Sequence, residues 1–400
     1  MSPVFTTFLA LTALASSAVA AQPKPKAPNG LKPGPAVYLI ANEDSGPPLN
    51  NGITFFQASG TQLTLLDSVL TEGVGIGGGY FGVSRVISPP DGSACIYASE
   101  AASGDIAALG MPSQELLGQF YGSDDDSGAS NGIGLAMNAK FLYAGFPDSN
   151  TIATFAVEDG CQLSFEGDTS VGGLNGGQVS GMAAHGNLLV VTYGDGSIES
   201  FDVSGGSPIS NGDLQNSTGF VNDNNNMPSS VDITQDGHFA IFGDIAVGTI
   251  VEVADISSGK LAATVPFIAA NGPNAGQNNV SSSTVRLSPD ESLLYIGNSQ
   301  GGTVTGAFFD KATGKIRSGC VTPAMNSYYN AWWFVGSIAT RDTTGTGGVV
   351  YAAEFPGNIA IVSVQSDGRT CTLTEAAGSP AQDPFVKGLL SIWVYPPRPF

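Results

Sequence analysis

The stretch that decides the fold is Ser283-Thr-Val-Arg-Leu-Ser-Pro-Asp-Glu-Ser-Leu-Leu-Tyr-Ile-Gly-Asn-Ser-Gln-Gly-Gly-Thr-Val-Thr-Gly-Ala-Phe-Phe309. Runs of β-branched and aromatic residues alternate here with turn residues, which is the pattern of strands joined by hairpins. We predict strands at 284–288, 293–297 and 303–309, with a tight turn around Pro289. A fourth strand near 316–321 would complete a four-stranded antiparallel unit.

The same unit recurs along the chain. A predicted innermost strand appears again in Val83-Ser-Arg-Val-Ile-Ser-Pro-Pro-Asp-Gly92, Gly132-Ile-Gly-Leu-Ala136, Gly181-Met-Ala-Ala-His185, Ser230-Val-Asp-Ile-Thr-Gln-Asp-Gly237 and Gly336-Ser-Ile-Ala-Thr340. Further strand-like runs follow each of them, such as Lys140-Phe-Leu-Tyr-Ala-Gly145. A period of roughly 45–50 residues built from short strands is typical of a β-propeller.

The two ends of the repeat complete one more unit. Gly388-Leu-Leu-Ser-Ile-Trp-Val-Tyr-Pro396 has the pattern of an innermost strand, and Ala36-Val-Tyr-Leu-Ile-Ala-Asn42 that of a second strand. Pairing the two leaves no open sheet edge between the first and last blades. We therefore predict an all-β fold, a seven-bladed β-propeller of four-stranded antiparallel blades that is closed by the C-terminal strand.

Three segments are expected along the chain. Residues 1–20 have an apolar core and the small-x-small sequence Ala18-Val19-Ala20, which is typical of a secretory signal peptide. The alternative is a buried strand. Residues 21–35, with spaced Pro and Lys, predict a short stiff linker, and residues 36–400 a single propeller domain. We therefore expect a protein secreted to the extracellular space or the cell wall.

The charge of the chain limits its partners. The formal net charge is -20 at pH 7, and charged residues make up only 12% of the sequence. Phosphate backbones and anionic membrane surfaces are therefore not expected partners. A strongly negative charge suits solubility in an acidic extracellular medium. We expect a monomer.

Four cysteines in a secreted chain predict disulfide bonds, and four cysteines allow three pairings. Cys320 and Cys371 fall on predicted outer strands of adjacent blades, so we expect that pair. Cys95 with Cys161 then follows by elimination. Asn216 and Asn279 begin Asn-x-Ser/Thr sequences and are expected to carry N-linked glycans.

The predicted fold sorts the polar residues between two faces. The face that carries the second-to-third strand loops and the connections between blades is called here the mouth face, and the face that carries the first-to-second strand turns the turn face. Amides and aromatics are concentrated in mouth-face segments, and such side chains suit a small sugar acid or a polysaccharide. The alternative is that Asn and Gly simply form turns. The expected ligand-binding residues are Asn131, Gln178, Asn224, Asn278 and Trp332.

Three residues are candidates for catalysis at the same mouth. Arg286, on a predicted inner strand, would hold a substrate carboxylate bidentately. The alternative for Arg286 is a structural ion pair with Asp232, which occupies the equivalent position of the preceding blade. Tyr80 and Lys387 are candidate bases.

Acidic residues recur at the ends of the second strands and would form a loose rim. One interpretation is a Ca²⁺ site, since Ca²⁺ prefers several oxygen ligands. The other is ordinary Asp and Glu turn chemistry, and because no dense run of ligands is present we expect no cofactor. The residues of this rim are Glu43, Asp44, Glu100, Asp148, Asp195, Asp244 and Glu354.

The two histidines, His185 and His238, both fall in predicted first-to-second strand turns. These turns lie on the turn face, away from the expected mouth. A histidine is a candidate general base, but a solvated turn histidine fits this position better. We therefore predict that neither histidine is catalytic.

Two stretches, Lys140-Phe-Leu-Tyr-Ala-Gly-Phe-Pro-Asp-Ser-Asn-Thr-Ile-Ala-Thr-Phe-Ala-Val157 and Leu287-Ser-Pro-Asp-Glu-Ser-Leu-Leu-Tyr295, resemble the lactonase-like seven-bladed propellers. That family includes 6-phosphogluconolactonase-type and 3-carboxymuconate-cyclase-type proteins. The signal peptide and the acidic composition resemble those of its secreted fungal members. The resemblance implies a His, a Glu and arginines at the channel mouth, whereas no histidine is predicted there in this chain.

Three functions remain open at this stage. The first is a lactonase or lyase acting on a sugar acid or uronate at the channel mouth. The second is a non-catalytic extracellular carbohydrate-binding or cell-wall surface protein that uses the same mouth. The third is a scaffold for protein interactions on the flat faces of the propeller.

Overall fold

The computed structural model divides the chain into two units, residues 1–35 and Ala36–Phe400. The residues that the structure describes all belong to the second unit. They are residues 37–42, 50–76, 84–123, 132–217, 228–244, 250–268, 281–299, 303–318, 320–321, 335–344, 347–354, 357–383 and 391–397.

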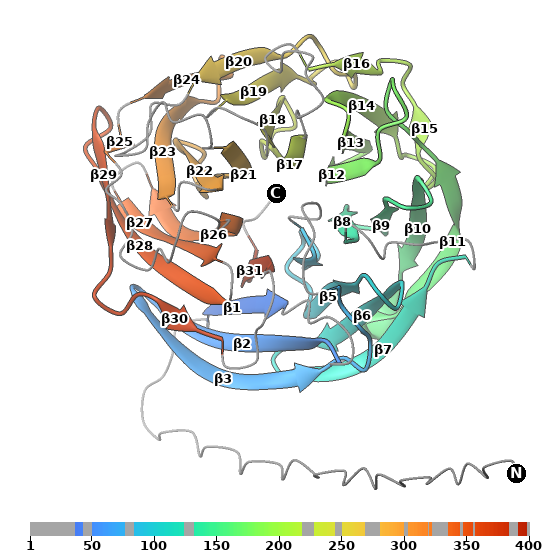
Figure 1. The fold of residues 1–400 in the computed structure, drawn as a ribbon, viewed down its shortest axis with the longest axis horizontal. Coiled ribbons are helices and arrows are strands. Elements are labelled where there is room, and N and C mark those ends of the chain that lie inside the picture. The colour runs from blue at the N-terminus through green and yellow to red at the C-terminus, as the bar shows by residue number, and fades with distance from the viewer. Residues whose placement is uncertain are drawn as a thin grey trace, which may run out of the picture. The chain divides into compact units, whose positions relative to one another are not determined.

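Seven sheets stand around a central axis, and each runs from an innermost strand near the axis to an outer strand at the rim (Figure 1). The strands of the first four blades are β31 (Ser391–Tyr395), β1 (Val37–Asn42), β2 (Gly52–Ser59) and β3 (Gln62–Leu70) in blade one; β4 (Val86–Ile87), β5 (Cys95–Glu100), β6 (Asp105–Gly110) and β7 (Glu115–Tyr121) in blade two; β8 (Gly134–Met137), β9 (Phe141–Phe146), β10 (Thr151–Val157) and β11 (Leu163–Ser170) in blade three; and β12 (Val179–His185), β13 (Leu188–Tyr193), β14 (Ser197–Asp202), β15 (Ile209–Ser210) and β16 (Gln215–Asn216) in blade four.

The remaining blades follow the same plan. Their strands, from the axis outward, are β17 (Pro228–Ile233), β18 (Phe239–Asp244), β19 (Ile250–Asp255) and β20 (Val265–Ile268) in blade five; β21 (Ser281–Leu287), β22 (Leu293–Ser299), β23 (Thr303–Asp310) and β24 (Lys315–Ser318) in blade six; and β26 (Val335–Thr344), β27 (Gly347–Glu354), β28 (Asn358–Ser366), β29 (Cys371–Glu375) and β25 (Cys320–Val321) in blade seven. The short strand β30 (Ala381–Gln382) also pairs with β28. One short 3-10 helix, η1 (Asp159–Cys161), precedes β11. The predicted seven-bladed, all-β propeller is confirmed, and none of the described helices is long and apolar enough to cross a membrane.

Position within a blade explains the hydrophobic pattern of each strand. All six residues of β5 and all six of β6 are buried, because the middle strands pack between two neighbouring blades. The outer strand β7 instead carries exposed Glu115 and Tyr121 at its two ends. Continuous apolar runs therefore mark middle strands, and mixed runs mark the rim.

The C-terminal strand closes the ring, as predicted. β31 pairs antiparallel with β1, from Tyr38 opposite Tyr395 to Asn42 opposite Ser391. The strand also reaches blade two, because the Trp393 indole N–H donates to Ser88 Oγ at 2.8 Å. The clasp therefore fills the innermost position of blade one and joins it to the next blade (Figure 1).

Side-chain hydrogen bonds fix the inner strands of neighbouring blades at matching heights. The Ser180 hydroxyl bonds the Pro228 carbonyl. The Val285 N–H donates to Ser230 Oγ at 3.0 Å, and the Leu287 N–H donates to Asp232 Oδ2 at 2.7 Å. These bonds show which inner-strand residues of blades four, five and six lie at the same height along the axis: Ser180 with Pro228, and Ser230 with Val285.

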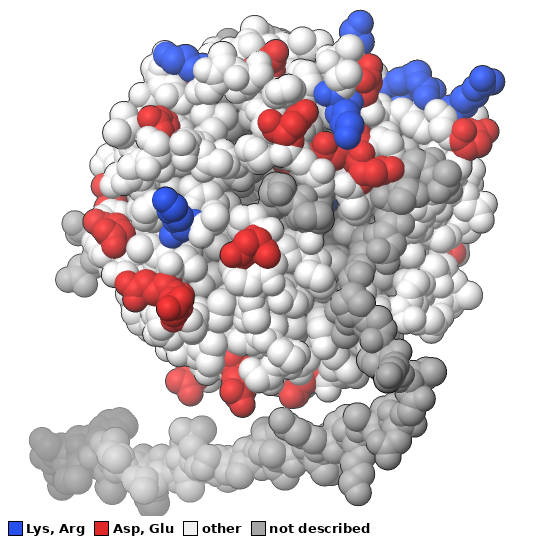
Figure 2. Space-filling model, turned by 180° about the vertical axis from the view of Figure 1, so that it is seen from behind, with Lys and Arg blue, Asp and Glu red and all other residues white. Residues whose placement is uncertain are grey.

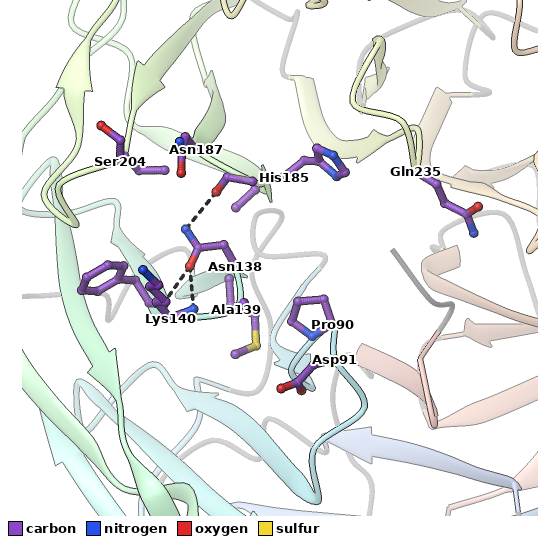
Figure 3. Close-up of a pocket in the computed structure, with 14 residues that line it drawn as sticks. Pro90, Asp91, Asn138, Ala139, Lys140, His185, Asn187, Ser204 and Gln235 are labelled. Carbon is purple, nitrogen blue, oxygen red and sulfur yellow. Dashed lines mark hydrogen bonds between the residues drawn. The ribbon is translucent and has the colours of Figure 1, made fainter.

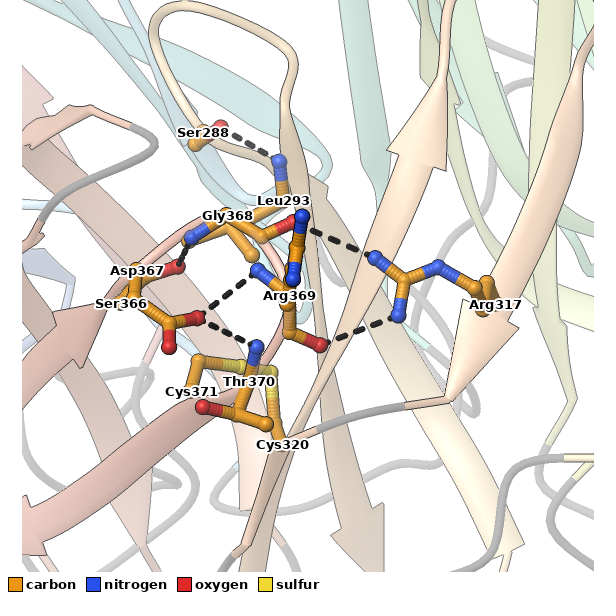
Figure 4. Close-up of a disulfide and its surroundings, with 10 residues drawn as sticks. All are labelled: Ser288, Leu293, Arg317, Cys320, Ser366, Asp367, Gly368, Arg369, Thr370 and Cys371. Carbon is orange, nitrogen blue, oxygen red and sulfur yellow. Dashed lines mark hydrogen bonds between the residues drawn. A yellow bond between two sulfur atoms is a disulfide. The ribbon is translucent and has the colours of Figure 1, made fainter.

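Both expected cysteine pairs are present, Cys95 with Cys161 and Cys320 with Cys371. The second bond joins β25, which follows the outer strand of blade six, to β29 of blade seven (Figure 4). Next to it, Arg317 of blade six donates to the carbonyls of Gly368 and Arg369 in blade seven, at 3.3 and 3.0 Å. The disulfide therefore joins two paired strands of the blade-seven sheet, not the outer strands of adjacent blades as expected, and the Arg317 guanidinium ties blade six to blade seven.

The disulfides give a direct prediction for the mature protein. Peptide mapping without reduction should recover one peptide that links Cys95 to Cys161 and another that links Cys320 to Cys371, because the fold brings the two cysteines of each pair together. Both peptides should separate on reduction. Free thiols at these positions, or a different pairing, would contradict the blade order.

Acidic side chains are scattered over the face seen from behind, whereas the basic ones are few and lie mostly toward one edge (Figure 2). The potential glycosylation residue Asn216 lies on the outer strand β16 and is exposed. Asn279 lies outside the described residues. Glycosylation at both stays a prediction.

Candidate functional site

Most of the residues expected at the mouth lie outside the part of the chain that the structure describes: Tyr80, Asn131, Asn224, Asn278, Trp332 and Lys387. Gln178 and Arg286 are described. The roles predicted for the other six stay predictions.

Gln178 and Arg286 lie at different heights along the axis. Gln178 immediately precedes β12, at the mouth-face end of the inner strand. Arg286 is the last residue but one of β21, where the chain leads into a first-to-second strand turn. The hydrogen bonds between blades place Arg286 at the height of Ala183 in blade four. Ala183 is five residues beyond Gln178, which corresponds to roughly 16 Å along the axis at about 3.3 Å per residue. The structure therefore does not bring these two residues together, and Arg286 lies toward the turn face.

The Arg286 side chain lines a small cavity on the axis, together with inner-strand residues of blades two to five and Trp393 of the clasp. The cavity has a volume of about 60 Å³. The guanidinium carbon lies 5.3 Å from the centre of the Trp393 ring, a cation–π contact. Since the Trp393 indole is itself fixed by Ser88, the arginine stacks on a ring of fixed orientation. The Arg286 side chain is 18% exposed.

Asp232 is the acidic partner of this arginine. Arg286 Nη1 lies 3.7 Å from Asp232 Oδ1, which is an ion-pair distance longer than a good hydrogen bond. The carboxylate is held by backbone donors, because Ile233 N–H donates to Oδ1 at 3.1 Å and Leu287 N–H to Oδ2 at 2.7 Å. The structural ion pair expected as the alternative is therefore present, and the same guanidinium also faces the cavity.

A second inner-strand arginine lies in blade two. Arg85, directly before β4, is fully buried, and burial lowers its pKa to about 10. Its guanidinium packs on Gly132 so closely that a Cβ there would lie 2.5 Å from Nη2. Arg85 lies three residues before Ser88 and Arg286 two residues before Ser288, in equivalent inner strands, so the two arginines differ by about one residue in height.

A larger pocket of about 560 Å³ opens on the turn face. It is formed by the first-to-second strand turns of blades two to five and by the third-to-fourth strand turn of blade four. The labelled residues lie around it in Figure 3, with Asn187 and Ser204 on one side, Gln235 on the other and His185 between them. The sequence did not predict this pocket, although polar residues at equivalent turns of adjacent blades were visible in it.

The histidines lie in the turns where the sequence predicts them. His185 ends β12 and lines the pocket, while His238 lies between β17 and β18. His238 is largely exposed, with Nδ1 3.3 Å from Asp236 Oδ2. That neither histidine is catalytic stays a prediction. Of the two, His185 lines the pocket.

Two acids of the predicted rim, Asp195 and Glu100, make local contacts within the fold. Burial alone would raise the pKa of Asp195, but hydrogen bonds from Ser197 and from the backbone N–H of Asn175 lower it overall. Glu100 is fully buried and bonded by the Thr71 hydroxyl. Among the residues that the structure describes, no three His, Cys, Asp or Glu side chains gather as metal ligands would. Glu43 and Asp44 lie outside these residues.

Comparisons with known proteins agree on the fold. No family model and no curated protein matches the sequence. A candidate 6-phosphogluconolactonase from Bacteroides fragilis matches with a TM-score of 0.63 and 16% identity over 89% of this chain and 98% of that one. Another from Bacteroides uniformis matches with a TM-score of 0.64 and 12% identity over 89% and 99%.

The periplasmic gluconolactonase PpgL of Pseudomonas aeruginosa matches with a TM-score of 0.63 and 13% identity over 89% of this chain and 99% of that one. At these identities the likeness shows the fold. The chain therefore has the same propeller fold as these three structures over nearly the whole length of the propeller unit.

Proposed function

We propose that the protein binds a small sugar acid, or the lactone from which such an acid forms, on the propeller axis, with Arg286 holding its carboxylate. The observation that carries the proposal is the position of Arg286, a cation that lines a small cavity on the axis of a chain with net charge -20. A guanidinium in a partly buried site interacts more strongly with an anion than one in water, because less solvent screens it. The lactonase-like architecture supports the same ligand class.

Hydrolysis of a lactone fits this arrangement. Water adds to the carbonyl carbon, the bond to the ring oxygen breaks, and the product is a hydroxy acid. Negative charge develops on the carbonyl oxygen during the addition and is carried by the carboxylate afterwards, so a fixed guanidinium favours both. A base must take the proton of the water. Tyr80 and Lys387, the predicted candidates, are expected at the mouth face and lie outside the described residues, so we assign no base beside Arg286.

Exchange of the arginine tests the proposal. Arg286→Gln should weaken gluconate binding, measured by titration calorimetry, by about 10- to 100-fold, because a charge-assisted hydrogen bond contributes roughly 1.5–3 kcal/mol. Arg317→Gln is the matched control, since Arg317 also lies over an aromatic ring, 4.3 Å from Phe308, but on the outer strand. Equal affinity in wild type and Arg286→Gln would contradict the proposal.

A second readout separates an enzyme from a binding protein. Gluconolactone hydrolysis, followed as acid release above the uncatalysed rate, should proceed in wild type and fall in Arg286→Gln. Binding without turnover would leave the alternative of a non-catalytic carbohydrate-binding protein, and a uronate polymer that gains an unsaturated bond would indicate a lyase. Binding of none of these would favour the scaffold.

We also propose that the protein is secreted to the extracellular space or the cell wall. Two disulfide bonds support this, because such bonds persist in oxidising compartments. The exposed Asn216 is compatible with glycosylation there.

A further inference from the structure

The cavity at Arg286 is too small for a sugar ring. Its volume of about 60 Å³ is well below the roughly 150 Å³ of a cavity that holds a benzene ring. A carboxylate group fits a space of this size. The rest of a sugar acid bound at Arg286 must therefore lie in the space that adjoins the cavity.

The adjoining space is the turn-face pocket. Pro90, Met137 and Ala184 line both the small cavity and the large pocket. Arg286 also lies near the turn-face end of its strand, as its place in β21 shows. A ligand whose carboxylate reaches Arg286 therefore extends into the pocket of about 560 Å³, a volume within the usual range of small-molecule sites.

The walls of the pocket are held in place by contacts between blades. Asn138 Nδ2 donates to the Gly186 carbonyl at 3.1 Å, which ties the turn of blade three to that of blade four (Figure 3). The His185 ring packs on Gly237, where φ is +68° and a Cβ would lie 2.6 Å from Cδ2. Gln235 Nε2 donates to the Pro289 carbonyl of blade six at 3.1 Å. Three of the blades that line the pocket, three to five, are thus tied to one another, and blade five is tied to blade six.

The lining suits a neutral sugar rather than a second acid. One acid, Asp91, and one cation, Lys140, balance each other in charge. The other polar groups include the amides of Asn187 and Gln235 and the hydroxyl of Ser204, which exchange hydrogen bonds with sugar hydroxyls. Phe141 adds an aromatic surface of the kind on which sugar rings stack.

We infer that the ligand is an oligosaccharide that ends in an acidic sugar: the terminal carboxylate enters the channel from the turn face and reaches Arg286, and at least one neutral sugar fills the pocket. This inference rests on the proposed function and deepens it. It names the chain length of the ligand and the face through which the ligand enters.

A pair of acids that differ by one sugar tests the inference. Lactobionate is gluconate that carries one galactose, so its carboxylate end is unchanged. We expect wild type to bind lactobionate at least 10-fold more tightly than gluconate in titration calorimetry, because the galactose contacts the pocket. Lactose, which lacks the carboxylate, should bind more weakly than lactobionate by a similar factor.

A variant that fills the pocket makes the test specific. Ser204→Trp should lower the affinity for lactobionate at least 10-fold, and by a larger factor than it lowers the affinity for gluconate, because the galactose lies deeper in the filled pocket. Ser257→Trp is the matched control: Ser204 N–H donates to Asp202 at 2.8 Å and Ser257 N–H to Asp255 at 2.9 Å, in the same turn of adjacent blades, but only Ser204 lines the pocket.

The outcomes separate this inference from the function on which it rests. Equal affinity of wild type for the two acids would overturn the inference. Full lactobionate affinity in a folded Ser204→Trp variant would overturn it as well. In both cases the proposed function would stand if Arg286→Gln still weakened gluconate binding. Failure of wild type to bind either acid would overturn both. The comparison of the two acids on wild type decides the matter even where the variant does not fold.

Discussion

A chain that ends at Leu390 should lose its cooperative unfolding transition or melt at least about 10 °C below the full-length protein. The deletion removes β31, which pairs with β1 from Tyr38 to Asn42. It also removes Ile392 and Val394, which are 1% and 8% exposed. Burial of two such side chains contributes roughly 3–6 kcal/mol, a large share of the roughly 5–15 kcal/mol that stabilises a domain.

The control for this deletion is a chain that ends at Pro397, which keeps all of β31 and should melt like the full-length protein. Differential scanning calorimetry measures both. A third variant, Ile392→Asp, keeps the length of the chain but places a charge in the interior, and it should also melt early. Equal melting of the Leu390 chain and the full-length protein would show that the ring does not depend on its C-terminal strand.

The variant Glu100→Gln should be more stable than wild type at pH 8 and nearly equal to it at pH 4. Burial, followed by the neighbouring Asp105, raises the pKa of Glu100 from its ordinary 4.5 to about 9. Asp105 lies opposite Glu100 in the β5–β6 pairing, and a Cβ at Gly73 would overlap the Glu100 carboxyl. The folded protein therefore binds a proton at Glu100 that the unfolded chain has released above about pH 4.5.

The sign of the pH dependence follows from this difference. Below pH 4.5 the group is protonated in both states, so Glu100 gives no penalty, and between about pH 4.5 and 9 the stability of wild type falls as the pH rises. Glutamine has no proton to release. We expect Glu100→Gln to exceed wild type by about 2 kcal/mol or more at pH 8, and by less than about 0.5 kcal/mol at pH 4.

Urea unfolding of the two proteins across this pH range measures the difference between them, so titration of other groups cancels. Glu115→Gln is the control, since Glu115 is exposed at the start of β7. A stability difference between Glu100→Gln and wild type that does not grow with pH would contradict the account of this buried acid. An increase in wild-type stability toward acid would also suit a protein that works in an acidic medium.

The fold could be predicted from the sequence because short stretches of sequence determine the strands and turns of each blade. Each blade repeats the same strand and turn chemistry, so one unit such as 283–309 identifies the others and their order. The clasp, the cysteine pairs and the histidine turns then follow from the position of each residue within its blade. None of these steps needs the distance between two blades.

The site could be predicted less far, because it depends on how blades are offset from one another. Arg286 was expected at the mouth with Gln178, but the hydrogen bonds from Val285 to Ser230 and from Leu287 to Asp232 set its height, and no strand pattern contains them. The turn-face pocket likewise arises from four turns that are ordinary one by one. Glu100 resembles a turn acid in sequence, and its burial becomes visible only when Gly73 lies against it.

The central claim is that an acidic sugar binds on the axis at Arg286, and a crystal structure with bound lactobionate tests it most directly. The account predicts the carboxylate within hydrogen-bond distance of the Arg286 guanidinium beside Trp393, and the galactose in the pocket between His185 and Gln235. Lactobionate bound only at the mouth face near Gln178, with Arg286 contacting Asp232 and Trp393 alone, would contradict the claim.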